Sequence, residues 1–180
     1  MNKSRVIGVL VTAVIAIFLV SATLGRAIYG GQSPSLTSFA LIHFAGYLFF
    51  LLMPVEALVP IYQGEGHAGS TLILIAIATA IAAQLIDYGI GRSIKEDSIH
   101  ELIGEKRYLR FKATIDKWGG WAIFLFNLMP LSSPNMLLVA GMTRYSARRA
   151  FLYSVIGLTG KYVAIVYVFE AASAWLAAAP

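Results

Sequence analysis

The stretch "FNLMPLSSPNMLLVAG", residues 126–141, is apolar enough to lie in a membrane, yet its middle is rich in residues that interrupt helices. Within nine residues it holds two prolines, two serines and two asparagines. Proline lacks a backbone N–H and blocks the carbonyl four residues back, so a helix is expected to break there. Non-helical backbone at membrane depth is tolerated only where protein buries it or where it lines a watery cavity. The stretch therefore predicts a broken helix beside a polar cavity.

The composition of the whole chain is that of an integral membrane protein. Its 180 residues are 58% hydrophobic and 13% charged, whereas soluble domains are about 45–50% apolar and about 25% charged. This length predicts one domain, 1–180. The absence of cysteine excludes a disulfide framework, thiol catalysis and cysteine metal sites. The net charge of +5 is better explained by membrane topology than by nucleic-acid binding.

Five segments of the chain are apolar, namely 6–25, 38–62, 69–91, 119–142 and 150–179. The first, the third and the start of the fifth are long enough to span a hydrocarbon core of about 30 Å. The first is read as a transmembrane helix rather than a signal peptide, because its apolar run exceeds a typical h-region. The second contains Pro54 and Pro60, and the fourth contains Pro130 and Pro134, so each is expected to break.

The positions of the basic residues decide which segments cross the membrane. If all five crossed, with the N-terminus inside, segment 92–117 and its seven lysines and arginines would lie outside. If the second and fourth segments are re-entrant hairpins, twelve of the fourteen lysines and arginines are cytoplasmic, as the positive-inside rule requires. We therefore predict an all-α polytopic membrane protein with three spanning helices, two opposed re-entrant hairpins and a cytoplasmic N-terminus.

The two broken segments also resemble each other. "LMPVEALVP" at 52–60 and "LMPLSSPNM" at 128–136 share Leu-Met-Pro, and their opposed entry would make an inverted repeat with its site at the repeat interface. Between them, residues 96–118 are predicted to form a cytoplasmic amphipathic helix. Its basic residues would face anionic lipid headgroups. Alternatively, this helix only packs against the bundle.

Three ionisable residues are candidates for a substrate or proton pathway. Glu56 lies two residues after Pro54, and an ionisable residue at that depth is a functional-site hypothesis; alternatively, it caps a half-helix N-terminus. Lys161 lies too deep in the last helix to reach either membrane face easily, so it needs a partner, either Glu56 or Asp87. Asp87 could instead form a structural salt bridge to Arg92 or Lys161.

Neutral polar residues around the second break complete the predicted pathway: Asn127, Ser133 and Asn135. They either satisfy backbone groups freed by the prolines or hydrogen-bond a polar headgroup. The predicted hairpin breaks are Pro54, Pro60, Pro130, Pro134 and Gly141. The predicted headgroup contacts are Arg92, Arg144, Arg148 and Arg149. His43 is interpreted as a packed histidine. Metal-ligand spacing, a phosphate loop and a nucleophile–base pattern are all missing from the sequence, so we expect no metal, no cofactor and no enzyme activity.

A family resemblance rests on "PVEALVP", "DYGIGR" and "WGGWAIFLFNLMPLSSPNMLLVAGMTRYSARRAFLYSVIG". These motifs resemble the DedA family of the VTT-domain superfamily over roughly residues 40 to 160. In that family a proline followed two positions later by an acidic residue marks the first hairpin, matched here by Pro54 and Glu56. The second hairpin of the family carries two arginines, whose positions are Asn127 and Ser133 here. This departure puts recognition of an anionic phosphate in question.

The resemblance implies lipid transport in the prokaryotic plasma (inner) membrane, because family members are implicated in moving phospholipids or polyprenyl phosphates between leaflets. Some members depend on the proton-motive force. The leading hypothesis is therefore a scramblase or flippase whose partners are membrane lipids and, if transport is coupled, protons. The alternatives are a proton-coupled transporter of a small solute or ion, and a structural membrane-assembly factor. No nucleic-acid partner is expected, and the sequence leaves a homo-oligomer open.

Overall fold

The computed structural model describes residues 35–48, 55–93, 104–129 and 133–178, and the regular elements within these ranges are all helices. The predicted all-α class is thus confirmed for the described residues. Helix 6–25, Pro54, Pro130 and the first part of segment 96–118 lie outside them. The elements are α2 (Leu36–Tyr47), η1 (Val55–Ala57), α3 (Leu58–Gly64), α4 (Gly69–Ser93), α6 (Glu105–Trp118), α7 (Gly120–Leu128), α8 (Ser133–Met142) and α9 (Ala147–Ala178).

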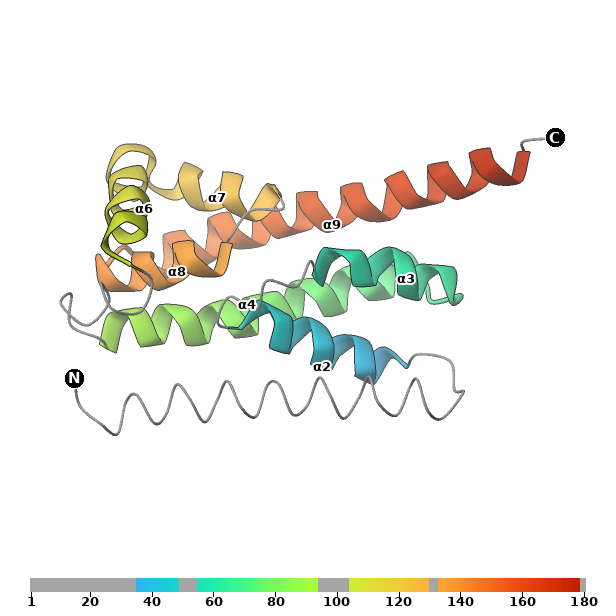
Figure 1. Cartoon of the computed structure of the whole chain (residues 1–180), viewed down its shortest axis with the longest axis horizontal. Coiled ribbons are helices and arrows are strands. Elements are labelled where there is room, and N and C mark those ends of the chain that lie inside the picture. The colour runs from blue at the N-terminus through green and yellow to red at the C-terminus, as the bar shows by residue number, and fades with distance from the viewer. Residues whose placement is uncertain (1–34, 49–54, 94–103, 130–132, 179–180) are drawn as a thin grey trace.

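Two long helices, α4 and α9, form the axis of the structure and run in opposite directions (Figure 1). Both are long and apolar enough to cross a membrane, with 25 and 32 residues. The face of α4 that packs inward carries Leu72, Ala76 and Ala80, four positions apart. This spacing places them on one side of the helix, and the two alanines let neighbouring helices approach closely.

Two helical hairpins pack on this axis and open toward opposite ends of it (Figure 1). In the first, α2 ends at Tyr47 and the chain resumes as η1 at Val55, after which α3 returns to the end from which α2 came. In the second, α7 ends at Leu128 and α8 begins at Ser133 and returns likewise. The two interruptions therefore lie toward the middle of the bundle, where α9 passes both.

Three of the residues predicted as hairpin breaks lie inside the helices that follow the breaks. Pro60 is the third residue of α3 and Pro134 the second residue of α8. In the first turn of a helix the backbone N–H has no intrahelical partner, so proline is tolerated there. Gly141 lies inside α8, where a Cβ atom would collide with the carbonyl oxygen of Tyr88 on α4. These prolines belong to the returning helices, and Gly141 is a close-packing residue.

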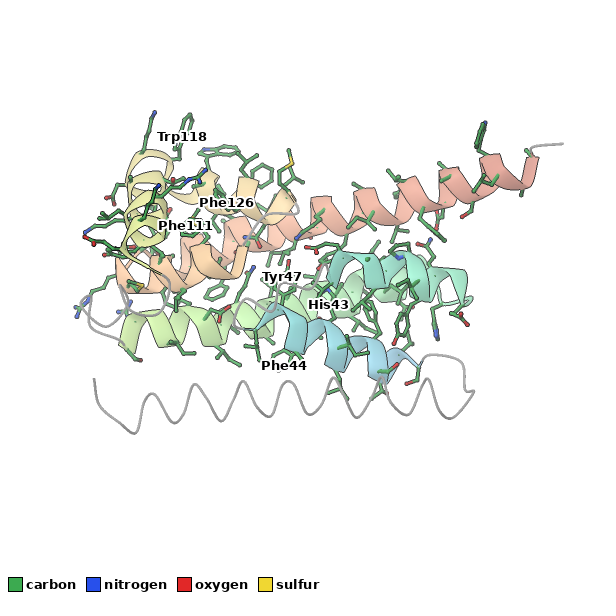
Figure 2. All side chains as sticks on the ribbon, viewed as in Figure 1. His43, Phe44, Tyr47, Phe111, Trp118 and Phe126 are labelled. Atoms are coloured by element: carbon green, nitrogen blue, oxygen red, sulfur yellow. The ribbon has the colours of Figure 1, made fainter. Side chains whose placement is uncertain are left out.

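The helix α6 lies across one end of the bundle, against α7 and α8 (Figure 1). It buries Tyr108, Phe111 and Ile115, three or four positions apart, as an amphipathic helix does. Phe111 meets Phe126 of α7 edge to face, with ring centroids 5.7 Å apart (Figure 2). Trp118, the last residue of the predicted amphipathic helix, is 58% exposed.

The outer surface of the bundle carries large apolar side chains. Leu74 on α4, Trp121 on α7 and Val168 on α9 are each more than 60% exposed. Exposed side chains of this kind are expected where a helix faces lipid.

Candidate functional site

A buried ion pair lies at the interruption of the first hairpin. Lys161, near the middle of α9, is 3% exposed, and its Nζ donates to Glu56 Oε1 at 2.9 Å. The same Nζ donates to the Tyr47 hydroxyl at 2.9 Å. Glu56 belongs to η1 and is 22% exposed. Of the two partners that the sequence offered for Lys161, the structure brings Glu56 to it.

Aromatic rings enclose the Lys161 ammonium group further. Its Nζ lies 5.5 Å from the ring centroid of Tyr47 and 5.6 Å from that of Tyr162. The faces of aromatic rings attract cations, and a buried charge is tolerated when it is paired and hydrogen-bonded. The end of α2, the start of the returning helix and the middle of α9 are therefore joined by one cation.

His43 continues this polar cluster toward α4. It is fully buried, and its Nδ1 lies 2.8 Å from Thr79 Oγ1 while its Nε2 lies 2.6 Å from the Tyr162 hydroxyl. Since the Thr79 hydroxyl donates to the Ile75 carbonyl, it must accept from His43. The network thus assigns the ring proton to Nδ1 and makes Tyr162 the donor to Nε2. Interpreted from the sequence as a packed histidine, His43 has both ring nitrogens engaged.

A second, uncharged polar cluster lies at the interruption of the second hairpin. Asn127, in the last turn of α7, is fully buried and accepts at Oδ1 from Gln84 Nε2 of α4 at 2.6 Å. Its Nδ2 donates to the Ile123 carbonyl at 2.9 Å and to Ser154 Oγ of α9 at 3.2 Å. Asn127 therefore links three helices, and one of its bonds goes to the carbonyl of Ile123, four positions earlier in α7.

Asp87 is buried in α4 and has no charged partner among the described residues. It is 3% exposed, and its Oδ2 meets no hydrogen-bond donor in the described part of the chain. Among the described residues the salt bridge considered from the sequence, to Arg92 or Lys161, is not formed: Arg92 Nη1 donates to the Tyr88 hydroxyl at 3.2 Å, and Lys161 binds Glu56. An unpaired carboxyl at this burial is costly and calls for an explanation.

The remaining predicted residues lie at the ends of helices. Ser133 and Asn135 are in the first turn of α8. Arg144, in the turn between α8 and α9, and Arg148 and Arg149, in the first turn of α9, are exposed. The turn between α8 and α9 lies at the end of the bundle where α6 packs (Figure 1). The structure therefore separates the candidates into a buried set and a basic set at one end.

Sequence reasoning missed several members of the buried set: Tyr47, Thr79, Gln84, Ser154 and Tyr162. A signal for two of them was present. Ser154 precedes Lys161 by seven positions, and Gln84 precedes Asp87 by three. Such spacings place residues on the same helical face. Listing the polar residues on the helical faces that carry Lys161 and Asp87 would therefore have found both.

Together, these features define an all-α membrane protein with buried polar groups at two helix interruptions. The family model of the VTT domain matches residues 36–171, from the first residue of α2 to the last third of α9. The chain therefore belongs to the VTT-domain family, which confirms the resemblance found in its motifs. Comparisons with curated proteins and with solved structures gave no match.

Proposed function

We propose that the protein moves lipid between the leaflets of the prokaryotic plasma (inner) membrane, with phospholipids or polyprenyl phosphates as substrates. The observation that carries this proposal is the buried pair of Glu56 and Lys161 at the interruption of the first hairpin. A headgroup crossing the hydrocarbon core needs polar groups along its way, while its acyl chains can stay in lipid. Intramembrane ionisable residues are rare and typically mark such pathways.

The proposed topology has three spanning helices, the segment 6–25, α4 and α9, with the α2–α3 and α7–α8 hairpins re-entrant from opposite faces. The opposite openings of the two hairpins support it (Figure 1). So does the charge pattern, because the exposed Arg144, Arg148 and Arg149 lie with α6 at one end. The positive-inside rule makes that end cytoplasmic, and the N-terminus lies on the same side in this arrangement.

The ion pair suggests how a headgroup would be held. Lys161 can donate to a phosphate oxygen, and Glu56 can accept from a headgroup amine or take up a proton. Among the described residues, Lys161 is the one buried cation, and Asn127 occupies a position where the DedA family carries arginine. Phosphate recognition inside the bundle would therefore fall to Lys161, with Arg92, Arg144, Arg148 and Arg149 as contacts at the cytoplasmic mouth.

The test is movement of a labelled phospholipid in proteoliposomes that contain the purified protein. Glu56→Gln keeps the size of the side chain and removes its charge, so lipid movement should be lost while the protein stays folded. Glu56→Asp should retain part of the activity. The matched control is Glu65→Gln, which removes an exposed carboxyl just after α3 and should move lipid at the wild-type rate. Full lipid movement by Glu56→Gln would remove Glu56 from the mechanism.

A second candidate function is proton-coupled transport of a small solute or ion, and the unpaired burial of Asp87 favours it. The two functions differ in liposomes that hold no other solute. A lipid transporter moves lipid there, whereas a solute transporter moves protons only after its solute is added. A structural assembly factor, the third alternative, would do neither. In the first two cases the protein acts by transport rather than by catalysis.

A further inference from the structure

We infer that His43 is a positioning residue, which holds the ammonium group of Lys161 in place through two tyrosines although its own hydrogen bonds go elsewhere. The two tyrosines are Tyr47 and Tyr162, whose ring centroids lie 5.5 Å and 5.6 Å from Lys161 Nζ. Each of these rings also contacts the imidazole ring of His43. His43 is therefore the neighbour that the two rings around the ammonium group share.

Tyr47 contacts His43 along helix α2. The two residues are four positions apart, a spacing that places side chains on one helical face. Their rings are stacked, with centroids 5.2 Å apart and planes inclined by 24°. The Tyr47 hydroxyl accepts from Lys161 Nζ at 2.9 Å. Because the stack restrains the Tyr47 ring, it also restrains the position of this acceptor.

Tyr162 is anchored to His43 by its hydroxyl group. His43 Nε2 accepts from that hydroxyl at 2.6 Å, and the two ring centroids are 5.4 Å apart. The bond fixes the tilt of the phenol ring, and the faces of such rings attract cations. Tyr162 is fully buried, so water does not replace the bond. The ring beside Lys161 is thus held by the histidine.

Thr79 of α4 anchors the other edge of the histidine ring. The Thr79 hydroxyl has a single proton, which it donates to the Ile75 carbonyl at 2.7 Å. It therefore accepts from His43 Nδ1, at 2.8 Å. The chain from Thr79 through His43 to Tyr162 joins α4, α2 and α9, and it ends at the ring beside Lys161.

This position makes three demands that a histidine can meet at once. The side chain donates to Thr79 from one nitrogen, accepts from Tyr162 at the other and presents a flat ring to Tyr47. A neutral imidazole does all three. Phenylalanine would offer the ring alone, and glutamine would offer the polar atoms alone. A residue that only filled space would need neither nitrogen.

Lys161 needs such support because a lysine side chain does not fix the position of its own charge. The ammonium group is carried on a flexible four-carbon stem, and its three donors rotate. A binding group acts well only when the residues around it lock its geometry. The effect of His43 on the pair of Glu56 and Lys161 stands whether or not the chain moves lipid. Its effect on lipid movement rests on the proposed function.

The experiment is a double-mutant cycle of the ion pair, with Glu56→Gln and Lys161→Met, run in the unaltered protein and again in Thr79→Val. Valine keeps the shape of threonine and removes the hydroxyl that accepts from His43. Unfolding of the full-length protein is followed by tryptophan fluorescence in mixed micelles of SDS and a mild detergent. The coupling energy between Glu56 and Lys161 should fall by about half in the Thr79→Val background.

Thr159→Val is the matched control for this background. Thr159 is exposed on α9, and its hydroxyl donates to the carbonyl four positions earlier, at 2.8 Å, as the Thr79 hydroxyl does. The control should leave the coupling energy of the ion pair unchanged. A histidine that only packs would affect overall stability and not the pair, so equal coupling energies in all three backgrounds would overturn the inference.

Variants of His43 itself give an independent test by their order of activity. His43→Gln can still accept from Tyr162, whereas His43→Phe keeps the stacked ring and loses both hydrogen bonds. Lipid movement in proteoliposomes should fall about 10- to 100-fold in His43→Phe, as is typical when a group that orients a ligand is lost. It should be partly retained in His43→Gln. The reverse order would show that the ring matters only for packing.

If His43→Phe does not fold, Tyr162→Phe removes the same hydrogen bond and keeps the ring beside Lys161. The cycle in that background should then show a reduced coupling energy, and an unchanged value would overturn the role of His43.

The two measurements separate this inference from the proposed function. A reduced coupling energy in Thr79→Val, in a protein that moves no lipid, would overturn the lipid function and leave the positioning role standing. Lipid movement with an unchanged coupling energy would overturn the positioning role alone. A reduced coupling energy with lipid movement at the wild-type rate would show that transport does not need Lys161 to be held in this way.

Discussion

The ion pair of Glu56 and Lys161 can be tested by a double-mutant cycle with Glu56→Gln, Lys161→Met and the double variant. Each single change leaves the partner without its counter-charge. The double change removes both charges and lets the methionine side chain pack against the rings that now enclose the ammonium group. The cycle therefore separates the free energy of the pair from the free energy of burying each side chain.

The structure predicts that the two single changes lower the free energy of unfolding by different amounts. Glutamine keeps an oxygen that can accept from Lys161, so Glu56→Gln should cost only the charge-assisted part of the bond, about 1–2 kcal/mol. Lys161→Met removes donors from both Glu56 and Tyr47 and should cost about 2–3 kcal/mol. This lies below the range of about 3–5 kcal/mol for a broken buried pair, because Glu56 is 22% exposed and water can reach it. The coupling energy should be about 1–3 kcal/mol.

Reversible unfolding in mixed micelles of SDS and a mild detergent, followed by tryptophan fluorescence, measures these free energies. Lipid movement is measured on the same samples in proteoliposomes. We expect the double variant to be more stable than the sum of the single changes and yet to move no lipid. Additivity within about 0.3–0.5 kcal/mol would show that the pair is not coupled. Wild-type lipid movement by the double variant would make the pair purely structural.

Three further predictions concern packing, polarity and topology. Gly141→Ala should lower stability by about 1–3 kcal/mol because its Cβ collides with α4, whereas Gly89→Ala meets no atom within 4 Å and should be neutral or stabilising in thermal unfolding. Asn127→Leu should cost about 1–3 kcal/mol in the same assay, because its amide partner on α4 loses its acceptor. Single cysteines at Glu65 and Thr143 should react with an impermeant maleimide from opposite faces; labelling from one face would contradict opposed hairpins.

The interruption of the first hairpin and the presence of a buried ion pair could be anticipated from the sequence. Each follows from a free-energy cost that a single residue imposes, a proline in a helix or a charged lysine inside the membrane. A proline in an apolar run predicts a break from backbone chemistry alone. A lysine that can reach neither membrane face predicts a buried acidic partner, and only a few acids in this chain were candidates. Choosing Glu56 over Asp87 needed the tertiary arrangement, because the choice depends on which helices meet at the middle of α9.

The contacts that could not be predicted depend on the relative placement of distant helices. Asn127 and Gln84 are 43 residues apart, and neither carries a charge that demands a partner. Gly141 looked like part of a break because it ends an apolar, proline-containing run, but its role is close contact with α4. A glycine needed for a turn and one needed for helix packing look alike in sequence.

The two hairpins are similar in architecture, but the polar groups at their interruptions differ in charge. This difference determines which groups a headgroup would meet first on the proposed path. The first interruption holds a charged pair, and the second holds the amides of Asn127 and Gln84. An anionic headgroup entering from the basic cytoplasmic mouth would therefore pass neutral groups before it reached Lys161. The unpaired acid, Asp87, lies on the same helical face as Gln84. An ionised Asp87 would therefore repel an anionic headgroup on this route.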